Sequence, residues 1–181
     1  MKPGQPARHT APAMQQLDIF ADSRDRVLLN TLADALVQGD RAAAHAAMAA
    51  LRSEFPDDRQ LGPATVLIDA LDGEALAAHS PVADAVAALA ARRPIDTLLH
   101  DAARTVLGRE AAPHWLTIRW LALARRARAL PFDPACTEAH AAALWLQGRA
   151  WAEAALQAQR GGVGLGACGV EGQCAGAAGE R

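Results

Sequence analysis

The chain has 181 residues, which is enough to bury the core of one domain without help from disulfides or metals. Hydrophobic residues make up 51% of it and aromatic residues only 4%, and about a quarter of all residues are alanine. Small apolar side chains of this kind suit closely packed helices and favour an all-α protein. The formal net charge of −2 disfavours a nucleic-acid-binding domain, which would present a broadly basic face.

Targeting signals are absent from the sequence pattern. The first residues include Lys2 but no apolar run follows, so we expect neither a secretory signal nor a membrane span. Three cysteines at irregular spacing are typical of reduced thiols and a cytoplasmic location. The 17 arginines against one lysine, together with the alanine content, are typical of a GC-rich bacterial genome.

The composition divides the chain into three parts. Residues 1–22 begin with Pro, Gly and Ala and lack an apolar period over their first part, so we expect a flexible N-terminal tail that carries a short linear motif. Residues 23–160 repeat apolar side chains at helical spacing and form the predicted folded domain. Residues 161–181 are rich in Gly and Ala, and we expect them to be a disordered tail.

About eight helices are expected in the folded domain, because apolar residues recur three and four positions apart between successive capping or breaking residues. The first helix is expected from Ser23 to Gly39 and the second from Asp40 to Phe55. The remaining starts are marked by Pro63, Ser80-Pro81, Pro94, Pro113, Asp133-Pro134 and the segment that carries Trp151.

Glycines at positions 39, 73, 108 and 148 each follow an apolar helix end, at intervals of 34, 35 and 40 residues. Near-constant spacing of this size is typical of stacked helical hairpins. The chain here resembles the tetratricopeptide-type repeat, best over residues 24–58, where Gly39, Asp40, Ala44 and Pro56 occupy positions at which that family favours the same residues. The resemblance implies a solenoid of antiparallel hairpins that binds other proteins; a less regular α-bundle is the alternative.

The end of the domain lacks the polar capping helix that a solenoid needs on its last face. Either that face binds something, or the chain is a truncated or frame-shifted copy of a longer repeat protein.

Gln16, Leu17, Asp18, Ile19 and Phe20 resemble the bacterial sliding-clamp-binding pentapeptide, with Ile19 in place of the usual Leu. The resemblance implies that the Leu and Phe side chains fill an apolar pocket of the clamp. The alternative is a strap in which these apolar residues cover the first hairpin.

Two further patterns could indicate a cofactor or a metal site. Gly164-Leu165-Gly166-Ala167-Cys168-Gly169 matches a dinucleotide fingerprint by letter, but it lacks the strand before it and the helix after it. Cys136 and His140 are four residues apart, yet no further ligands accompany them as tetrahedral zinc requires. We therefore expect no cofactor and no metal, with Cys136 as a small buried thiol and His140 on the surface.

A basic stretch lies near the end of the predicted sixth helix, where positive charge complements the helix dipole. The stretch comprises Arg119, Arg125, Arg126 and Arg128. We interpret it by default as a solvated helix face, and the alternative is a patch that binds an acidic partner or a nucleic acid.

No nucleophile, base and orienting group occur together in a recognisable pattern. The sequence therefore predicts a non-enzymatic protein–protein interaction or scaffold module with an unidentified protein or peptide partner. Two alternatives stay open: a bacterial sliding-clamp-associated protein in DNA metabolism, and a subunit or fragment of an enzyme without a recognisable motif.

Overall fold

The computed structural model describes residues 14–160, with side chains from residue 24 onward, and within that range it is all-helical with no strand. The tail residues 1–13 and 161–181 lie outside the described residues. The α-helices are α1 (Met14–Gln38), α2 (Arg41–Glu54), α3 (Leu61–Ala77), α4 (Ala85–Pro94), α5 (His100–Val106), α6 (Gly108–Ala127), α7 (Ala141–Gln147) and α8 (Trp151–Arg160). Two short segments are the π-helix η1 (Ile95–Leu99) and the 3-10 helix η2 (Thr137–Ala139).

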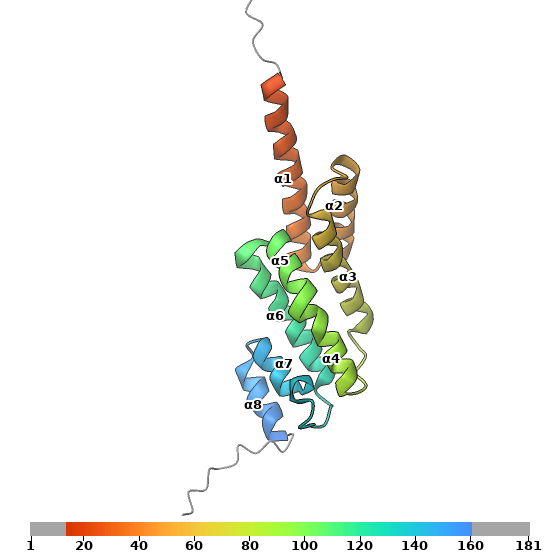
Figure 1. The fold of residues 1–181 in the computed structure, drawn as a ribbon, viewed down its shortest axis with the longest axis vertical. Coiled ribbons are helices and arrows are strands. Elements are labelled where there is room, and N and C mark those ends of the chain that lie inside the picture. The colour runs from red at the N-terminus through yellow and green to blue at the C-terminus, as the bar shows by residue number, and fades with distance from the viewer. Residues whose placement is uncertain (1–13, 161–181) are drawn as a thin grey trace, which may run out of the picture.

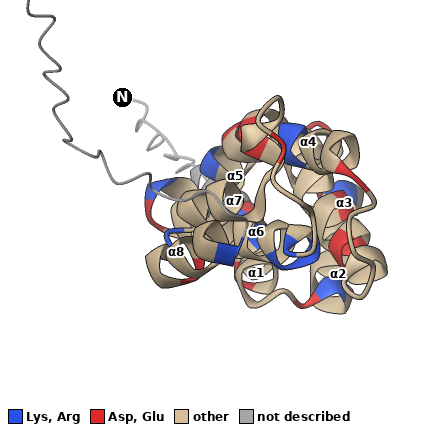
Figure 2. Ribbon diagram, turned by 90° about the horizontal axis from the view of Figure 1, so that it is seen from below, with Lys and Arg blue, Asp and Glu red and all other residues tan. Residues whose placement is uncertain are grey.

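Most helices that follow one another in the chain pack against one another, whereas α3 packs on α5 rather than on α4. The molecule is elongated, with α1 and α8 toward opposite ends (Figure 1). Seen along the long axis, α6 lies between α1 on one side and α4 and α5 on the other (Figure 2). The position of α6 makes it the helix that connects the N-terminal hairpin to the C-terminal one.

The turn between α1 and α2 confirms the predicted role of Gly39. Its φ of +71° is a left-handed conformation that favours glycine. The amide of Asp40 donates to Ala35 O at 3.0 Å and the amide of Gly39 donates to Leu36 O at 3.3 Å, which closes the end of α1 as a Schellman motif. The Asp40 carboxylate then accepts from the Ala43 amide at 3.0 Å and caps α2.

The prediction that Pro94 starts a helix is wrong, because α4, η1 and α5 form one continuous helix from residue 85 to residue 106. Proline removes one backbone donor and its ring crowds the preceding turn. The wider π-helical turn that follows at Ile95–Leu99 accommodates this disruption without ending the helix. Since the predicted fourth and fifth helices are one, residues 14–160 contain seven separate α-helices instead of eight.

The turn predicted at Gly73 is also wrong, since α3 continues through it to Ala77. A single glycine costs a helix interior only about 1 kcal/mol, and the buried face of Leu67, Ile68 and Leu71 holds the helix against its neighbours. The next helix is capped by Asp84, whose carboxylate accepts from the Ala87 amide at 2.7 Å, rather than by Ser80. Four hairpins turning at the four glycines are therefore not formed.

Three other predicted helix starts are displaced. The helix α1 begins at Met14 instead of near Ser23, so the expected flexible tail is helical in part; no Pro or Gly interrupts residues 14–38. Similarly α6 begins at Gly108, whose φ is +78°, and Pro113 lies inside it. The predicted seventh helix is divided into η2 and α7.

Gly148 marks the predicted turn between α7 and α8 for a reason other than its own conformation. The left-handed residue there is Arg149, with φ of +57°. A Cβ on Gly148 would lie 2.5 Å from Leu121 Cδ2, so this glycine lets α7 approach α6 closely.

One core of leucine, alanine and a few larger side chains runs through the described residues. The largest fully buried side chains are Trp115, Leu32, Leu36, Leu51, Leu67 and Leu144. Among helices of the described range, none has the length and apolar character to cross a bilayer.

Replacing Leu36 by Ala is expected to lower the free energy of unfolding by roughly 2–5 kcal/mol, because a fully buried side chain leaves a cavity. Leu76 is 85% exposed and supplies the matched control; Leu76→Ala is expected to change stability by less than about 0.5 kcal/mol. Denaturant unfolding followed by circular dichroism measures both, and equal effects of the two changes would contradict the packing described.

Candidate functional site

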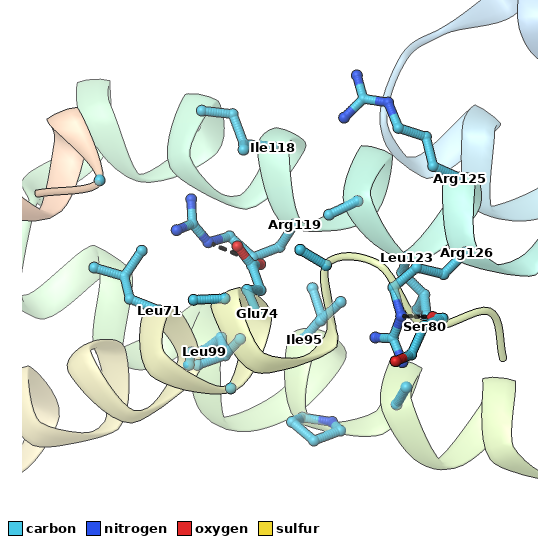
Figure 3. A pocket seen from close by; sticks show the side chains of 18 of the residues that line it. Leu71, Glu74, Ser80, Ile95, Leu99, Ile118, Arg119, Leu123, Arg125 and Arg126 are labelled. Atoms are coloured by element: carbon cyan, nitrogen blue, oxygen red, sulfur yellow. Dashed lines mark hydrogen bonds and ion pairs between the residues drawn. The ribbon is translucent and has the colours of Figure 1, made fainter. Parts of the chain in front are cut away.

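A cleft of about 980 Å³ lies between α3, the long α4–η1–α5 helix and α6, with the turn after α1 at one end. Its volume is near the upper limit of the ~300–1,000 Å³ common for ligand sites. Leu71, Ile95 and Leu99 supply apolar side chains on the α3 and η1 sides (Figure 3). The charged side chains of the lining are five arginines and one carboxylate: Arg41, Arg119, Arg125, Arg126, Arg128 and Glu74.

Trp115 fixes α6 relative to the first hairpin. Its indole Nε1–H donates a buried hydrogen bond of 3.0 Å to Leu36 O, in the last turn of α1. The Arg119 guanidinium lies 3.7 Å from the centre of the Trp115 ring, and its Nη1 donates to Trp115 O at 3.2 Å. Stacking of a cation on a desolvated indole is favourable because the ring face is electron-rich.

Arg119 and Glu74 face each other across the interior of the cleft, from α6 and α3 respectively (Figure 3). Arg119 Nε lies 3.2 Å from Glu74 Oε1, and Arg119 is only 4% exposed. Burial raises the pKa of the Glu74 carboxyl above its usual value, opposed by the charges of Arg119 and Arg126. Burial lowers the pKa of Arg119, opposed by the charge of Glu74. Arg119 and Glu74 thus form a partly desolvated ion pair, in which the charge of each partner offsets part of the cost of burying the other.

Arg126 closes the far end of the cleft by holding the loop between α3 and α4. Its Nε donates to Ser80 O at 3.0 Å, and its carbonyl accepts from the Val82 amide at 3.1 Å (Figure 3). The next carbonyls at the end of α6 are also satisfied, because Leu130 N donates to Ala127 O and Gln157 Nε2 donates to Arg128 O. These carbonyls therefore do not depend on an arginine side chain as their donor.

The four arginines singled out from the sequence all line this one cleft. The interpretation as a solvated surface is wrong for Arg119, which lies one helical turn from buried Trp115 and one from buried Leu123 and so faces inward. Arg125 and Arg128 are exposed and Arg126 is half-buried. Sequence reasoning missed Glu74 entirely, since a single carboxylate beside a glycine carries no recognisable pattern.

The pentapeptide Gln16–Phe20 lies in the first turns of α1. This part of α1 extends beyond α2 and the rest of the body (Figure 1). The side chains of these five residues lie outside the described ones, so the strap over the first hairpin stays a prediction.

The expectation of a surface imidazole at His140 is wrong, because the ring is buried. Its Nδ1 accepts from the Ala142 amide at 3.4 Å as the N-cap of α7, and its ring makes an edge contact with Phe132. Burial lowers the pKa of His140. Cys136 is half-buried and unpaired. No three metal-ligating side chains gather among the described residues, and the glycine pattern at 164–169 lies outside them.

Comparison of the chain with models of known protein families, with curated proteins and with solved structures found no match. The argument about function therefore rests on the cleft itself.

Replacing Arg119 by Met is expected to lower the free energy of unfolding at pH 7 by roughly 2 kcal/mol, because Glu74, 31% exposed, then holds a half-desolvated charge without its cation. The folded-state pKa of Glu74, already raised, rises further. Protonated Glu74 stabilises the fold below its unfolded pKa, and this stabilisation is lost as pH rises through the folded pKa.

The stability of Arg119→Met should consequently fall more steeply between about pH 5 and 7 than that of the wild type. Denaturant unfolding at a series of pH values measures this slope. The double change Arg119→Met, Glu74→Gln is the control and should remove the extra slope. An identical slope in the single and double variants would show that Glu74 is not coupled to Arg119.

Proposed function

We propose that this protein is a non-enzymatic interaction module that holds a segment of a partner protein in the Glu74–Arg119 cleft. The observation that carries the proposal is the composition of the cleft: an apolar lining of ligand-site size with charged groups at defined positions. Such a surface suits a peptide segment, which offers apolar side chains for the floor and polar groups for the rim.

Two features of the all-helical fold support the same proposal. The hairpins α1–α2 and α7–α8 turn at glycine-containing segments, and the two helices of each hairpin pack on one another. Helical arrays of this kind offer long concave surfaces for other proteins.

Catalysis is the less favoured alternative because the cleft does not gather acid–base groups. Its lining contains one carboxylate, Glu74, and one histidine, His79, which is exposed. Glu74 is already held by Arg119 at 3.2 Å. General acid–base or nucleophilic chemistry needs at least two groups within hydrogen-bonding reach of a reacting atom.

A displayed library of random 12-residue peptides tests the proposal, with the full chain immobilised as bait. The variant Ala75→Trp places a large side chain at an exposed position of the lining, and Ala90→Trp is the matched control at an exposed position outside it. We expect peptides that bind the wild type and Ala90→Trp with dissociation constants in the micromolar range, about −7 to −8 kcal/mol, and that bind Ala75→Trp at least tenfold more weakly. Selected peptides that bind all three proteins equally, or a selection that yields none, would contradict the proposal.

A second candidate is association with a bacterial sliding clamp through Gln16–Phe20. The position of this pentapeptide favours it, since the part of α1 that carries it extends past the other helices (Figure 1). A partner can therefore reach it without separating α1 from α2. The clamp would accept the apolar side chains of Leu17 and Phe20 in a pocket.

A titration of the protein against purified clamp decides between the two interpretations of this segment. The double change Leu17→Ala, Phe20→Ala is expected to abolish binding, because these two side chains would supply most of the contact with the clamp. The helical circular dichroism and the thermal midpoint should stay unchanged, because this part of α1 extends beyond the other helices (Figure 1). No association of the wild type at tens of micromolar, which is weaker than about −6 kcal/mol, would remove the clamp as a partner.

A further inference from the structure

We infer that the segment held in the cleft is acidic and amphipathic, carrying carboxylates beside apolar side chains. This inference rests on the proposed function and names the chemistry of its partner. It follows from the charge balance of the lining, from the exposed arginines at the rim of the cleft, Arg125 and Arg128, and from the apolar floor. The floor is formed by Leu71, Ile95, Leu99 and Leu123.

The charge balance of the cleft is opposite to that of the protein. The whole chain has a formal net charge of −2, whereas the cleft lining contains five arginines and a single carboxylate. That carboxylate, Glu74, is paired with the buried Arg119, and Arg41 lies 3.8 Å from Asp72, which is outside the lining. The remaining guanidinium groups, those of Arg125, Arg126 and Arg128, have no ion pair with a carboxylate of the lining. A concentration of one charge sign in a cleft attracts a ligand of the other sign.

Two of these arginines, Arg125 and Arg128, are exposed and available to a ligand, whereas Arg126 donates to Ser80 O. Among the side chains that the structure describes, no Asp or Glu lies within ion-pair distance of Arg125, Arg126 or Arg128. The carbonyl of Arg126 and the carbonyls of Ala127 and Arg128 already have backbone or side-chain donors. These three carbonyls therefore do not need the Arg125 or Arg128 side chain as a donor, and a planar guanidinium is suited to bind a carboxylate through two hydrogen bonds.

The apolar floor of the cleft indicates that the ligand also carries apolar side chains. Leu71, Ile95, Leu99 and Leu123 line the interior of the cleft, and each of them is buried against the core. Ile118 adds a partly exposed apolar side chain on the α6 side (Figure 3). Apolar side chains of a ligand gain free energy by leaving water here, so a uniformly charged segment would use only the rim.

A nucleic acid is the competing polyanion, and the cleft suits it less well. The two tryptophans of α6, Trp115 and Trp120, are buried and cannot stack on bases. The apolar floor offers nothing to phosphates, which are recognised by basic and polar groups.

The peptides selected from the library supply the first measurement. We expect the cleft-dependent ones, which bind the wild type but not Ala75→Trp, to contain at least twice as much Asp and Glu as the unselected library. The best of them is then synthesised with every Asp and Glu replaced by Asn and Gln. We expect this neutral form to bind at least tenfold more weakly, and binding of the acidic form to weaken as NaCl increases.

Charge reversal on the protein supplies the second measurement. Arg125→Glu, Arg128→Glu changes two exposed arginines of the rim, and Arg104→Glu, Arg109→Glu changes two exposed arginines outside the cleft by the same total charge. We expect the rim variant to bind the acidic peptide at least tenfold more weakly than the wild type, and the control variant to bind within threefold. Thermal unfolding of both variants checks that they are folded.

The outcomes distinguish failure of the acidic assignment from failure of the proposed peptide-binding function. Cleft-dependent peptides that are neutral or basic, or equal effects of the two charge reversals, would overturn the acidic assignment and leave the binding module in place. A selection without cleft-dependent peptides would overturn both. A 12-nucleotide oligo(dT) is compared with the acidic peptide in the same assay. Tighter binding of the oligonucleotide to the wild type, lost in the Arg125→Glu, Arg128→Glu variant, would assign the cleft to a nucleic acid instead.

Discussion

The hydrogen bond from Trp115 to Leu36 O is the contact on which the rest of the structure depends. It joins the middle of α6 to the last turn of α1, across 79 positions of sequence, and it is fully buried. An indole donor left without an acceptor in such a place would cost about 1–3 kcal/mol, so the two helices have one favoured relative position. The Gly39 turn that follows Leu36 is thereby set at one end of the cleft.

Arg119 places a charged group beside Trp115, inside the cleft. One turn beyond Trp115, its guanidinium stacks on the indole and reaches Glu74 of α3. Replacing an internal ion pair by apolar side chains is often neutral or stabilising, so such a pair contributes little to stability by itself. Under the proposed function the pair has a second role: Glu74 neutralises the buried arginine, so that the exposed arginines of the lining would carry the charge that a partner meets.

The sequence was informative where a local rule decides the structure. Gly39 and Asp40 predicted their turn because a left-handed residue followed by a capping carboxylate has one common conformation. Pro94 and Gly73 misled because their local cost is small beside the burial of the faces that flank them, so the helices continue. The arginine stretch was recognised, but the inward direction of Arg119 and its pairing with Glu74 arise only when α3 and α6 are brought together. Composition alone gave the all-helical class and no hint of the cleft.

A crystal structure of the protein with a cleft-selected acidic peptide tests the account most directly. The account predicts a peptide between α3 and α6, with apolar side chains over Leu71 and Leu99 and carboxylates within about 4 Å of Arg125 or Arg128. Glu74 should still be paired with Arg119. A peptide seated instead on the exposed apolar side chains of Trp151 and Leu156 on α8, with the cleft unchanged, would contradict it.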